Sequence, residues 1–270
     1  MDRVKNQPKD LQISENTTYH SLQITKIEQE TADSCSIYFE PTDPQFYKYT
    51  PGQHLNLKIK IGHQIYYRVF SLSSSPVTDK FLRITVRRHS VVTNYLQNQA
   101  KVGDTLQALF PAGDFGLKLE PTNHKHYLLV AGGSGITPLF SILRSVLATE
   151  KNSQITLLYA NRNRERAIFA DELENLAAIN QNFNLDHFFS NQKRINQESL
   201  TPYLTQPDIS DIYICGPDSL KQIVKQASQQ ISKDKTQLRI HQEDFADGFV
   251  SIFSALAKPK QTLVKPYITS

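Results

Sequence analysis

Two stretches decide the fold of this chain: YRVFSLS at residues 67–73 and AGGSGITP at residues 131–138. The first alternates like a β-strand, and the second is a glycine-rich turn between an apolar strand and a helix. Because glycine lacks a Cβ, such a turn lets the backbone approach a phosphate group that the following helix N-terminus also attracts. The second stretch therefore predicts a nucleotide-binding turn, with a turn that merely saves space as the alternative.

Outward from the first stretch, residues 21–119 consist of short β-rich runs broken by Gly and Pro turns. This spacing predicts a small antiparallel barrel. One short helix is expected at 94–98. The expected strands are 24–27, 36–39, 54–61, 65–71, 81–87 and 105–110.

After residue 121 the pattern changes to buried strands alternating with helices, which predicts a parallel sheet covered by helices. The first of these helices is expected to have Thr137 as N-cap and Pro138 at its first helical position. The fold class is thus an antiparallel β-barrel followed by an α/β parallel-sheet domain. Its expected strands are 127–131, 155–160, 185–189, 212–215 and 238–241. The predicted divisions are a flexible segment 1–20, the barrel 21–119, the α/β domain 120–245 and a tail or linker remnant 246–270.

Composition narrows the function classes. The net charge of +4 suits anionic ligands or an acidic partner, although a solvated surface explains it equally well. The sequence has no basic stripe with interleaved aromatic residues, so it does not favour nucleic-acid binding. The first twenty residues lack the apolar run of a signal peptide, and no segment is long enough to cross a bilayer, so we expect a cytoplasmic protein that is not transmembrane. Neither the two cysteines nor the histidine spacing indicates a disulfide framework or a metal site.

The tetrapeptide from Arg68 to Ser71 carries groups that suit a flavin. The planar arginine fork matches phosphate oxygens, Phe70 offers a flat neighbour, and Ser71 offers a hydrogen bond near the flavin N5. Taken alone, an ordinary amphipathic strand explains these residues as well. Their surroundings decide between the two interpretations.

Those surroundings resemble the ferredoxin-NADP reductase superfamily, in which a barrel binds a flavin and the second domain presents a nicotinamide to it. Within the superfamily the chain looks most like oxygenase reductases of the phenylacetyl-CoA epoxygenase type. In this family, backbone amides and a hydroxyl at the start of a short helix receive the flavin phosphates, and the resemblance assigns that hydroxyl to Thr93. Ser90 and Val91 depart from the family, whose members usually have a glycine shortly before this hydroxyl residue. The matching stretches are YTPGQ (49–53), VFSLSSSP (69–76), VRRH (86–89), VTNYL (92–96), PAGDF (111–115), the glycine turn, YANR (159–162), IFADEL (168–173), ICGP (214–217) and IHQEDF (240–245).

The resemblance implies a flavoprotein oxidoreductase with FAD, in preference to FMN, as its bound cofactor. It places Cys215 against the reactive carbon of the nicotinamide and Glu243 near the flavin edge, so Ser71, Cys215 and Glu243 are the predicted catalytic residues. The predicted cofactor-binding residues are Arg68, Val69, Phe70, Ser71, Arg87, Val92, Thr93, Gly132, Gly133, Gly135, Thr137, Pro138, Arg162, Arg166, Cys215, Gly216 and Pro217.

The stretch YANRNRER at residues 159–166 bears on the electron donor. It contains three arginines and no acid before Glu165, at the strand end where an acid would bind the ribose hydroxyls of NADH and a base the additional phosphate of NADPH. NADPH is therefore favoured over NADH, with a solvated loop as the competing interpretation.

Reductases of this type normally continue into a plant-type ferredoxin domain whose four cysteines hold a 2Fe-2S cluster. This chain has only Cys35 and Cys215, so we expect no such cluster in it. The expected function is electron transfer from NADPH through FAD to a ferredoxin or to an oxygenase or desaturase component. Two alternatives remain open: a free-flavin reductase, and a flavin-binding electron-transfer protein that does not oxidise a pyridine nucleotide itself.

Overall fold

The first part of the chain forms a six-stranded antiparallel sheet in the order β4-β3-β6-β1-β2-β5. The computed structural model describes residues 18–231 and 238–243. The strands are β1 (His20–Thr31), β2 (Ser34–Phe39), β3 (His54–Ile61), β4 (Gln64–Ser71), β5 (Leu82–Arg87) and β6 (Thr105–Ala108). All six lie where the sequence pattern predicts a strand, although β6 ends before Phe110.

The sheet closes into a barrel just beyond the end of β4. Leu72 forms an isolated bridge with Ile84 of β5, and the amide of Ser73 donates to the carbonyl of Arg83 at 2.7 Å. Alternating side chains of β3, including Leu55 and Leu57, fill the barrel interior. This closure places the predicted flavin strand next to β5. Two short helices, η1 (Pro44–Tyr47) and α1 (Val91–Asn98), complete the barrel.

The second part is a five-stranded parallel sheet in the order β11-β10-β7-β8-β9. The strands are β7 (His126–Gly132), β8 (Gln154–Asn161), β9 (Phe183–Phe189), β10 (Ile209–Cys215) and β11 (Arg239–Glu243). The three central strands are buried on both faces because helices cover both sides. The predicted fold class is confirmed.

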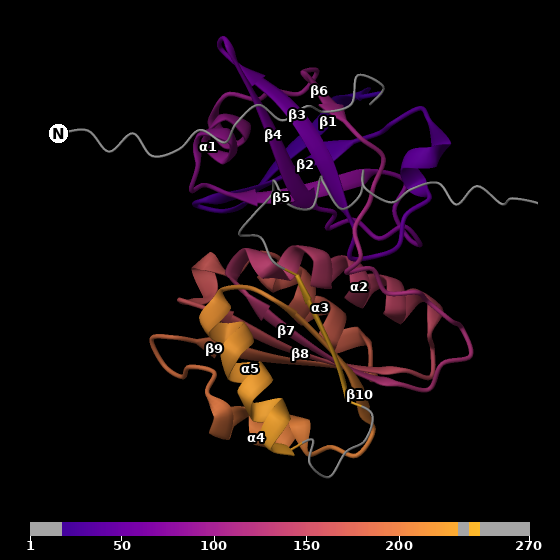
Figure 1. Cartoon of the computed structure of the whole chain (residues 1–270), viewed down its shortest axis with the longest axis vertical. Helices are drawn as coiled ribbons and strands as arrows, with labels where there is room; N and C mark the ends of the chain where they lie inside the picture. The colour runs from indigo at the N-terminus through magenta and orange to yellow at the C-terminus, as the bar shows by residue number, and fades with distance from the viewer. Residues whose placement is uncertain (1–17, 232–237, 244–270) are drawn as a thin grey trace, which may run out of the picture.

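The helices divide between the two faces of this sheet, as Figure 1 shows. One face packs on α2 (Ile136–Thr149) and α3 (Ala170–Ile179), and the other packs on α4 (Gln197–Leu204) and α5 (Asp218–Ile231). In Figure 1, α2 and α3 lie between the sheet and the barrel, so they form the contact surface between the two domains. Two 3-10 turns, η2 (Gly133–Gly135) and η3 (Arg164–Arg166), follow β7 and β8.

The predictions about the chain ends cannot be compared with this structure. The tail 246–270 and most of the segment 1–20 lie outside the described residues, although β1 already begins at His20. Within residues 18–231 and 238–243, no helix is both long and apolar enough to span a membrane.

Candidate functional site

The glycine turn after β7 is built so that no side chain larger than hydrogen fits. Gly133 has a φ of +55°, and a Cβ on Gly135 would lie 2.1 Å from the carbonyl oxygen of Cys215. A Cβ on Gly132 would lie 2.7 Å from Cδ of Pro217. The turn therefore packs backbone to backbone on the end of β10, which is the close approach that the sequence predicts for a nucleotide-binding turn.

The start of α2 differs from the prediction. The helix begins at Ile136 with Gly135 as its N-cap, so Thr137 is not the N-cap and Pro138 is the third helical residue. The Thr137 hydroxyl instead donates to the carbonyl of Ser134 at 3.0 Å. The 3-10 turn at Gly133–Gly135 already has helical geometry, and this moves the helix start two residues upstream.

The two predicted catalytic residues of the second domain are neighbours. Cys215 of β10 and Glu243 of β11 are register partners in adjacent parallel strands. Cys215 is fully buried, and Gly216 follows it with a φ of +156°. Together with the glycine turn, these residues gather at the carboxyl ends of the strands, the edge where open α/β sheets bind ligands.

The predicted flavin strand, β4, presents its residues on two faces. Arg68 and Phe70 are register partners of Leu57 and Leu55, whose side chains belong to the barrel core. Arg68 is half-buried, with its guanidinium 5.8 Å from the Tyr66 ring centroid. Val69 and Phe70 are also half-buried, whereas Ser71 is 6% exposed. This end of β4 is thus anchored in the barrel while part of its side-chain surface faces outward.

The start of α1 offers backbone donors, but its threonine hydroxyl is already in use. Ser90 and Thr93 form a capping box, in which the Thr93 hydroxyl accepts hydrogen bonds from the amides of His89 at 3.0 Å and Ser90 at 2.9 Å. Thr93 is also 3% exposed. The first helical amides, those of Val91 and Val92, have no intrahelical acceptors by geometry. They suit the predicted phosphate contact better than the Thr93 hydroxyl does. The same capping box explains why α1 begins at Val91, three residues before the predicted start.

Arg87 at the end of β5 joins the barrel to the glycine turn. Its Nη1 would lie 2.9 Å from a Cβ on Gly133, and its Nη2 donates to the carbonyl of Arg166 at 2.5 Å. Its Nε donates to the Ser34 hydroxyl at 3.2 Å. Arg87 therefore lies at a junction of the barrel, the glycine turn and the basic turn that follows β8.

The three arginines of the basic run differ in their partners. Arg164 pairs with Asp171 and Glu174 inside its own domain. Arg166 pairs across the domains with Asp33 in the turn between β1 and β2. Partial burial raises the pKa of Asp33. The hydrogen bonds that its carboxylate accepts from Arg166 and Thr31 outweigh this effect, and the pKa lies below its ordinary value.

Arg162 is exposed on the same loop. Of the two predicted phosphate ligands, then, Arg166 has an internal acid as its partner, while Arg162 faces solvent.

Nearby, the end of β8 holds a buried acceptor. Asn161 is 8% exposed, and its Oδ1 has no hydrogen-bond partner within the described part of the chain. Leaving a buried acceptor unpaired costs about 1–3 kcal/mol, which a donor from a ligand would offset. A ribose hydroxyl is such a donor, so this strand end and the tight glycine turn fit a nucleotide.

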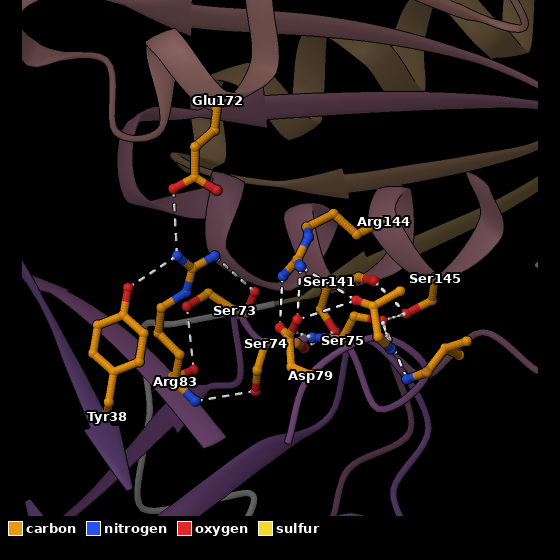
Figure 2. Close-up of polar contacts among 12 residues, drawn as sticks. Tyr38, Ser73, Ser74, Ser75, Asp79, Arg83, Ser141, Arg144, Ser145 and Glu172 are labelled. Atoms are coloured by element: carbon orange, nitrogen blue, oxygen red, sulfur yellow. Dashed lines mark hydrogen bonds and ion pairs between the residues drawn. The ribbon is translucent and has the colours of Figure 1, made fainter. Parts of the chain in front are cut away.

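A second set of residues was missed from the sequence: the buried interface, which comprises Arg83 and residues 73–79 of the barrel with their partners on α2 and α3 (Figure 2). Arg83 was the available signal. It is a charged residue in a strand whose neighbours on both sides, Leu82 and Ile84, are fully buried. A buried charge requires partners, and those of Arg83 come from both domains: Tyr38 and Ser73 of the barrel, and Glu172 of α3.

Comparison with known proteins gives a consistent result. Residues 21–116 match the oxidoreductase FAD-binding domain family, and residues 129–226 match the oxidoreductase NAD-binding domain family. A component of the 1,2-phenylacetyl-CoA epoxidase of Escherichia coli is 30% identical, over 85% of this chain and 68% of that component. The ferredoxin reductase component of the 3-ketosteroid-9-alpha-monooxygenase of Mycobacterium tuberculosis is 34% identical over 81% of this chain.

The chain spans only 64% of that mycobacterial relative's length. Among solved structures, the FAD/NAD-binding domain of a nitric oxide dioxygenase from Vibrio cholerae superimposes with a TM-score of 0.66 and 25% identity. That match covers 83% of this chain and 97% of the Vibrio domain. The two-domain arrangement therefore occurs as a unit in that solved structure.

Proposed function

The chain belongs to the family of FAD- and NAD-binding oxidoreductases that includes reductase components of oxygenases, and from this premise we propose that it oxidises NADPH and passes the electrons through bound FAD to a ferredoxin or to an oxygenase or desaturase component. The observation that carries the proposal is the junction at Arg87. There the barrel strand that pairs with the end of the flavin strand contacts the glycine turn of the nucleotide-binding domain. The two predicted cofactor sites thus meet at one seam.

When bound, FAD would accept a hydride, two electrons with one proton, from NADPH to leave NADP⁺, and would then release the electrons singly to the acceptor. The chain's own residues would bind the flavin and the nucleotide and orient their rings. Arg68 and the amides at the start of α1 would hold the flavin phosphates, and Ser71 would donate a hydrogen bond to the flavin ring. The protein's main contribution is to hold two rings in contact.

On the nucleotide side, Gly132, Gly133 and Gly135 would receive the pyrophosphate. Cys215, fully buried under the turn, would pack against the nicotinamide. Glu243, its neighbour across the strands, would hold or relay a proton near the flavin edge. The proposed limits of the two domains are residues 21–119 and 120–245, and we place the protein in the cytoplasm.

Arg162 supports the choice of NADPH because it is an exposed cation at the strand end where the additional phosphate would lie. A charge-assisted phosphate contact contributes about 1.5–3 kcal/mol, or roughly ten-fold or more in affinity. Arg162→Ala should therefore raise KM for NADPH about ten-fold and leave KM for NADH nearly unchanged. Equal changes for the two nucleotides would remove the support for NADPH.

The function itself is tested on the purified full chain. We expect one flavin per chain, identified as FAD after release, and ferricyanide reduction that depends on NADPH. Flavin that is consumed from solution but never co-purifies would indicate a free-flavin reductase. Bound flavin without nucleotide-dependent turnover would indicate an electron-transfer protein that receives its electrons from another protein.

A further inference from the structure

Arg83 is a barrel residue whose charge is buried between the two domains. It is the second residue of β5 and is 3% exposed. Its guanidinium carbon is 4.6 Å from the ring centroid of Phe169 and 5.2 Å from that of Phe140. These two rings, from the start of α3 and from α2, stack on each other with centroids 4.3 Å apart. A cation over a desolvated aromatic pair is a favourable contact, and here it crosses the domain boundary.

The hydrogen bonds of this guanidinium are long, and they point to both domains. Nη1 lies 3.3 Å from the Tyr38 hydroxyl and 3.4 Å from a carboxylate oxygen of Glu172, and Nη2 lies 3.4 Å from the carbonyl of Ser73 (Figure 2). Its Nε has no hydrogen-bond partner in the described part of the chain. Hydrogen bonding alone therefore does not account for the placement of this charge. The contact with Phe140 and Phe169 supplies the rest of its stabilisation.

The backbone of the same residue is joined to the end of the flavin strand. The Ser73 amide donates to the carbonyl of Arg83 at 2.7 Å, and the amide of Arg83 donates to the Ser74 hydroxyl at 3.0 Å. Ser73 comes only two residues after Ser71, the residue proposed to contact the flavin ring. Arg83 thus connects the flavin strand, through its backbone, to α2 and α3, through its side chain.

Helix α2 makes the second half of this connection. The Ser141 hydroxyl donates to the carbonyl of Ser74 at 2.6 Å, and the hydroxyls of Ser145 and Ser75 lie 2.8 Å apart, both pairs buried. This helix begins directly after the glycine turn. Because a helix is a rigid element, docking its middle on residues 74 and 75 fixes where its N-terminal turn lies relative to β4.

We propose that Arg83 is a positioning residue that sets the distance and angle between the flavin strand and the nucleotide turn, and thereby the rate of hydride transfer. It does so by holding Phe140 and Phe169 of the nucleotide-binding domain against β5, with the serine contacts of α2 in support. The kinetic part of this inference rests on the proposed function. The geometric part does not.

Domain orientation is measured first, because it needs neither nucleotide nor turnover. Val102 of the barrel and Ile179 at the end of α3 are 62% and 77% exposed, whereas both native cysteines are buried. Spin labels on Val102→Cys and Ile179→Cys give an interdomain distance distribution by pulsed electron paramagnetic resonance. We expect one narrow distribution in the otherwise native chain and a broader or displaced one in Arg83→Met. Arg194→Met, the same change at an exposed position of the nucleotide-binding domain, should leave the distribution unchanged.

The kinetic consequence is measured by stopped flow with the flavin-loaded protein. At saturating NADPH, Arg83→Met should reduce flavin about ten-fold or more slowly, since misplacement of about 1 Å costs up to about a hundred-fold in rate. Its flavin content and the NADPH concentration for half-maximal rate should change by less than about two-fold, since no cofactor contact is lost. Arg83→Lys should recover only part of the rate, because an ammonium keeps the charge without the planar stacking surface.

A second variant covers the case in which Arg83→Met does not fold. Ser141→Ala combined with Ser145→Ala removes the hydroxyls of α2 while favouring the helix, and it should shift the distance distribution and the rate in the same direction. The proposal is overturned if the variants that fold lose stability but keep both the native distribution and the native rate. If the native chain shows no reduction of flavin by NADPH, the proposed function fails, while the distance distributions still decide the positioning role.

Discussion

The barrel meets the nucleotide-binding domain through two contacts of opposite character. At the buried interface, the side chain of Asp79 is 5% exposed and receives two bonds of 2.6 Å from Arg144 of α2, whose side chain is 22% exposed. The contact between Asp33 and Arg166 is an ion pair whose side chains are 15% and 44% exposed. Separating buried partners leaves polar groups unpaired, whereas a ligand anion can replace one partner of an exposed pair. The first contact is suited to fixing orientation, and the second to responding to a nucleotide.

The largest effect is expected from removing the cation of the buried pair. Arg144→Met leaves the carboxylate of Asp79 without its two-pronged partner, so the free energy of unfolding should fall by about 2–3 kcal/mol. Chemical denaturation monitored by circular dichroism measures the loss. The free energy of unfolding of Arg144→Lys should lie between those of the native chain and Arg144→Met, because lysine keeps the charge but not the two-pronged geometry. A loss below about 0.5 kcal/mol would place this pair in the same class as the exposed contact.

A smaller effect is expected from overpacking the contact of Gly52 with Phe115 and with Ile142 of α2. Gly52 has a φ of +100°, and a Cβ there would lie 2.9 Å from the carbonyl oxygen of Phe115 and 3.1 Å from Cδ1 of Ile142 in α2. Gly103 has a similar φ of +95° with open space around it. Gly52→Ala should therefore lower the free energy of unfolding by about 1–2 kcal/mol more than Gly103→Ala does.

This pair of glycine variants isolates packing from backbone strain, since both alanines carry the strain of a positive φ. Equal losses in thermal or chemical unfolding would mean that Phe115 and Ile142 make room for the added Cβ at no cost.

The exposed contact should control nucleotide choice more than stability. Asp33→Asn releases Arg166 for the additional phosphate of NADPH, so the ratio of KM for NADPH to KM for NADH should fall about two- to five-fold. The ratio is the quantity compared because Asp33 also pairs with Arg87, 3.5 Å away beside the glycine turn, where both nucleotides would bind. Steady-state ferricyanide reduction with each nucleotide provides the measurement. Asp171→Asn, the same change at a partner of Arg164 within one domain, serves as the control. An unchanged ratio of the two Michaelis constants would show that Arg166 is no ligand of that phosphate.

The smallest effect is the dependence on pH and salt of the stability that the ion pair between Asp33 and Arg166 contributes. Because the folded-state pKa of Asp33 is depressed below 3.8, its stabilising contribution is complete above that value and is lost as pH falls through the folded pKa. The stability difference between the native chain and Asp33→Asn should stay below about 1 kcal/mol and hold constant from neutral pH to about pH 4. It should shrink at lower pH and in high salt. A difference that grows in salt would contradict an exposed ion pair.

Sequence patterns predicted the layers of this molecule well, because the apolar strands of the parallel sheet express burial on both faces directly. The glycine turn was also predictable, since a crowded backbone restricts each position to glycine. Details that depend on local hydrogen bonding were not. The capping box of Ser90 and Thr93 and the 3-10 turn before Ile136 moved two helix starts.

The partners of charged residues could not be predicted at all. Three arginines in the stretch after β8 look equivalent in sequence, yet Arg164 pairs locally, Arg166 pairs with the barrel and Arg162 faces solvent. These differences arise from the docking of two domains, which brings Asp33 within reach of a residue 133 positions away. Arg83 likewise acquires its two nearest aromatic contacts, with Phe169 and Phe140, only across the domain boundary.

The central claim is that one seam holds two rings close enough for hydride transfer, and an anaerobic absorbance titration of the purified chain tests it most directly. The account predicts a bound-flavin spectrum that bleaches on addition of one equivalent of NADPH, with Arg83→Met bleaching to the same end point but more slowly. Bound flavin whose spectrum neither NADPH nor NADH alters would contradict it.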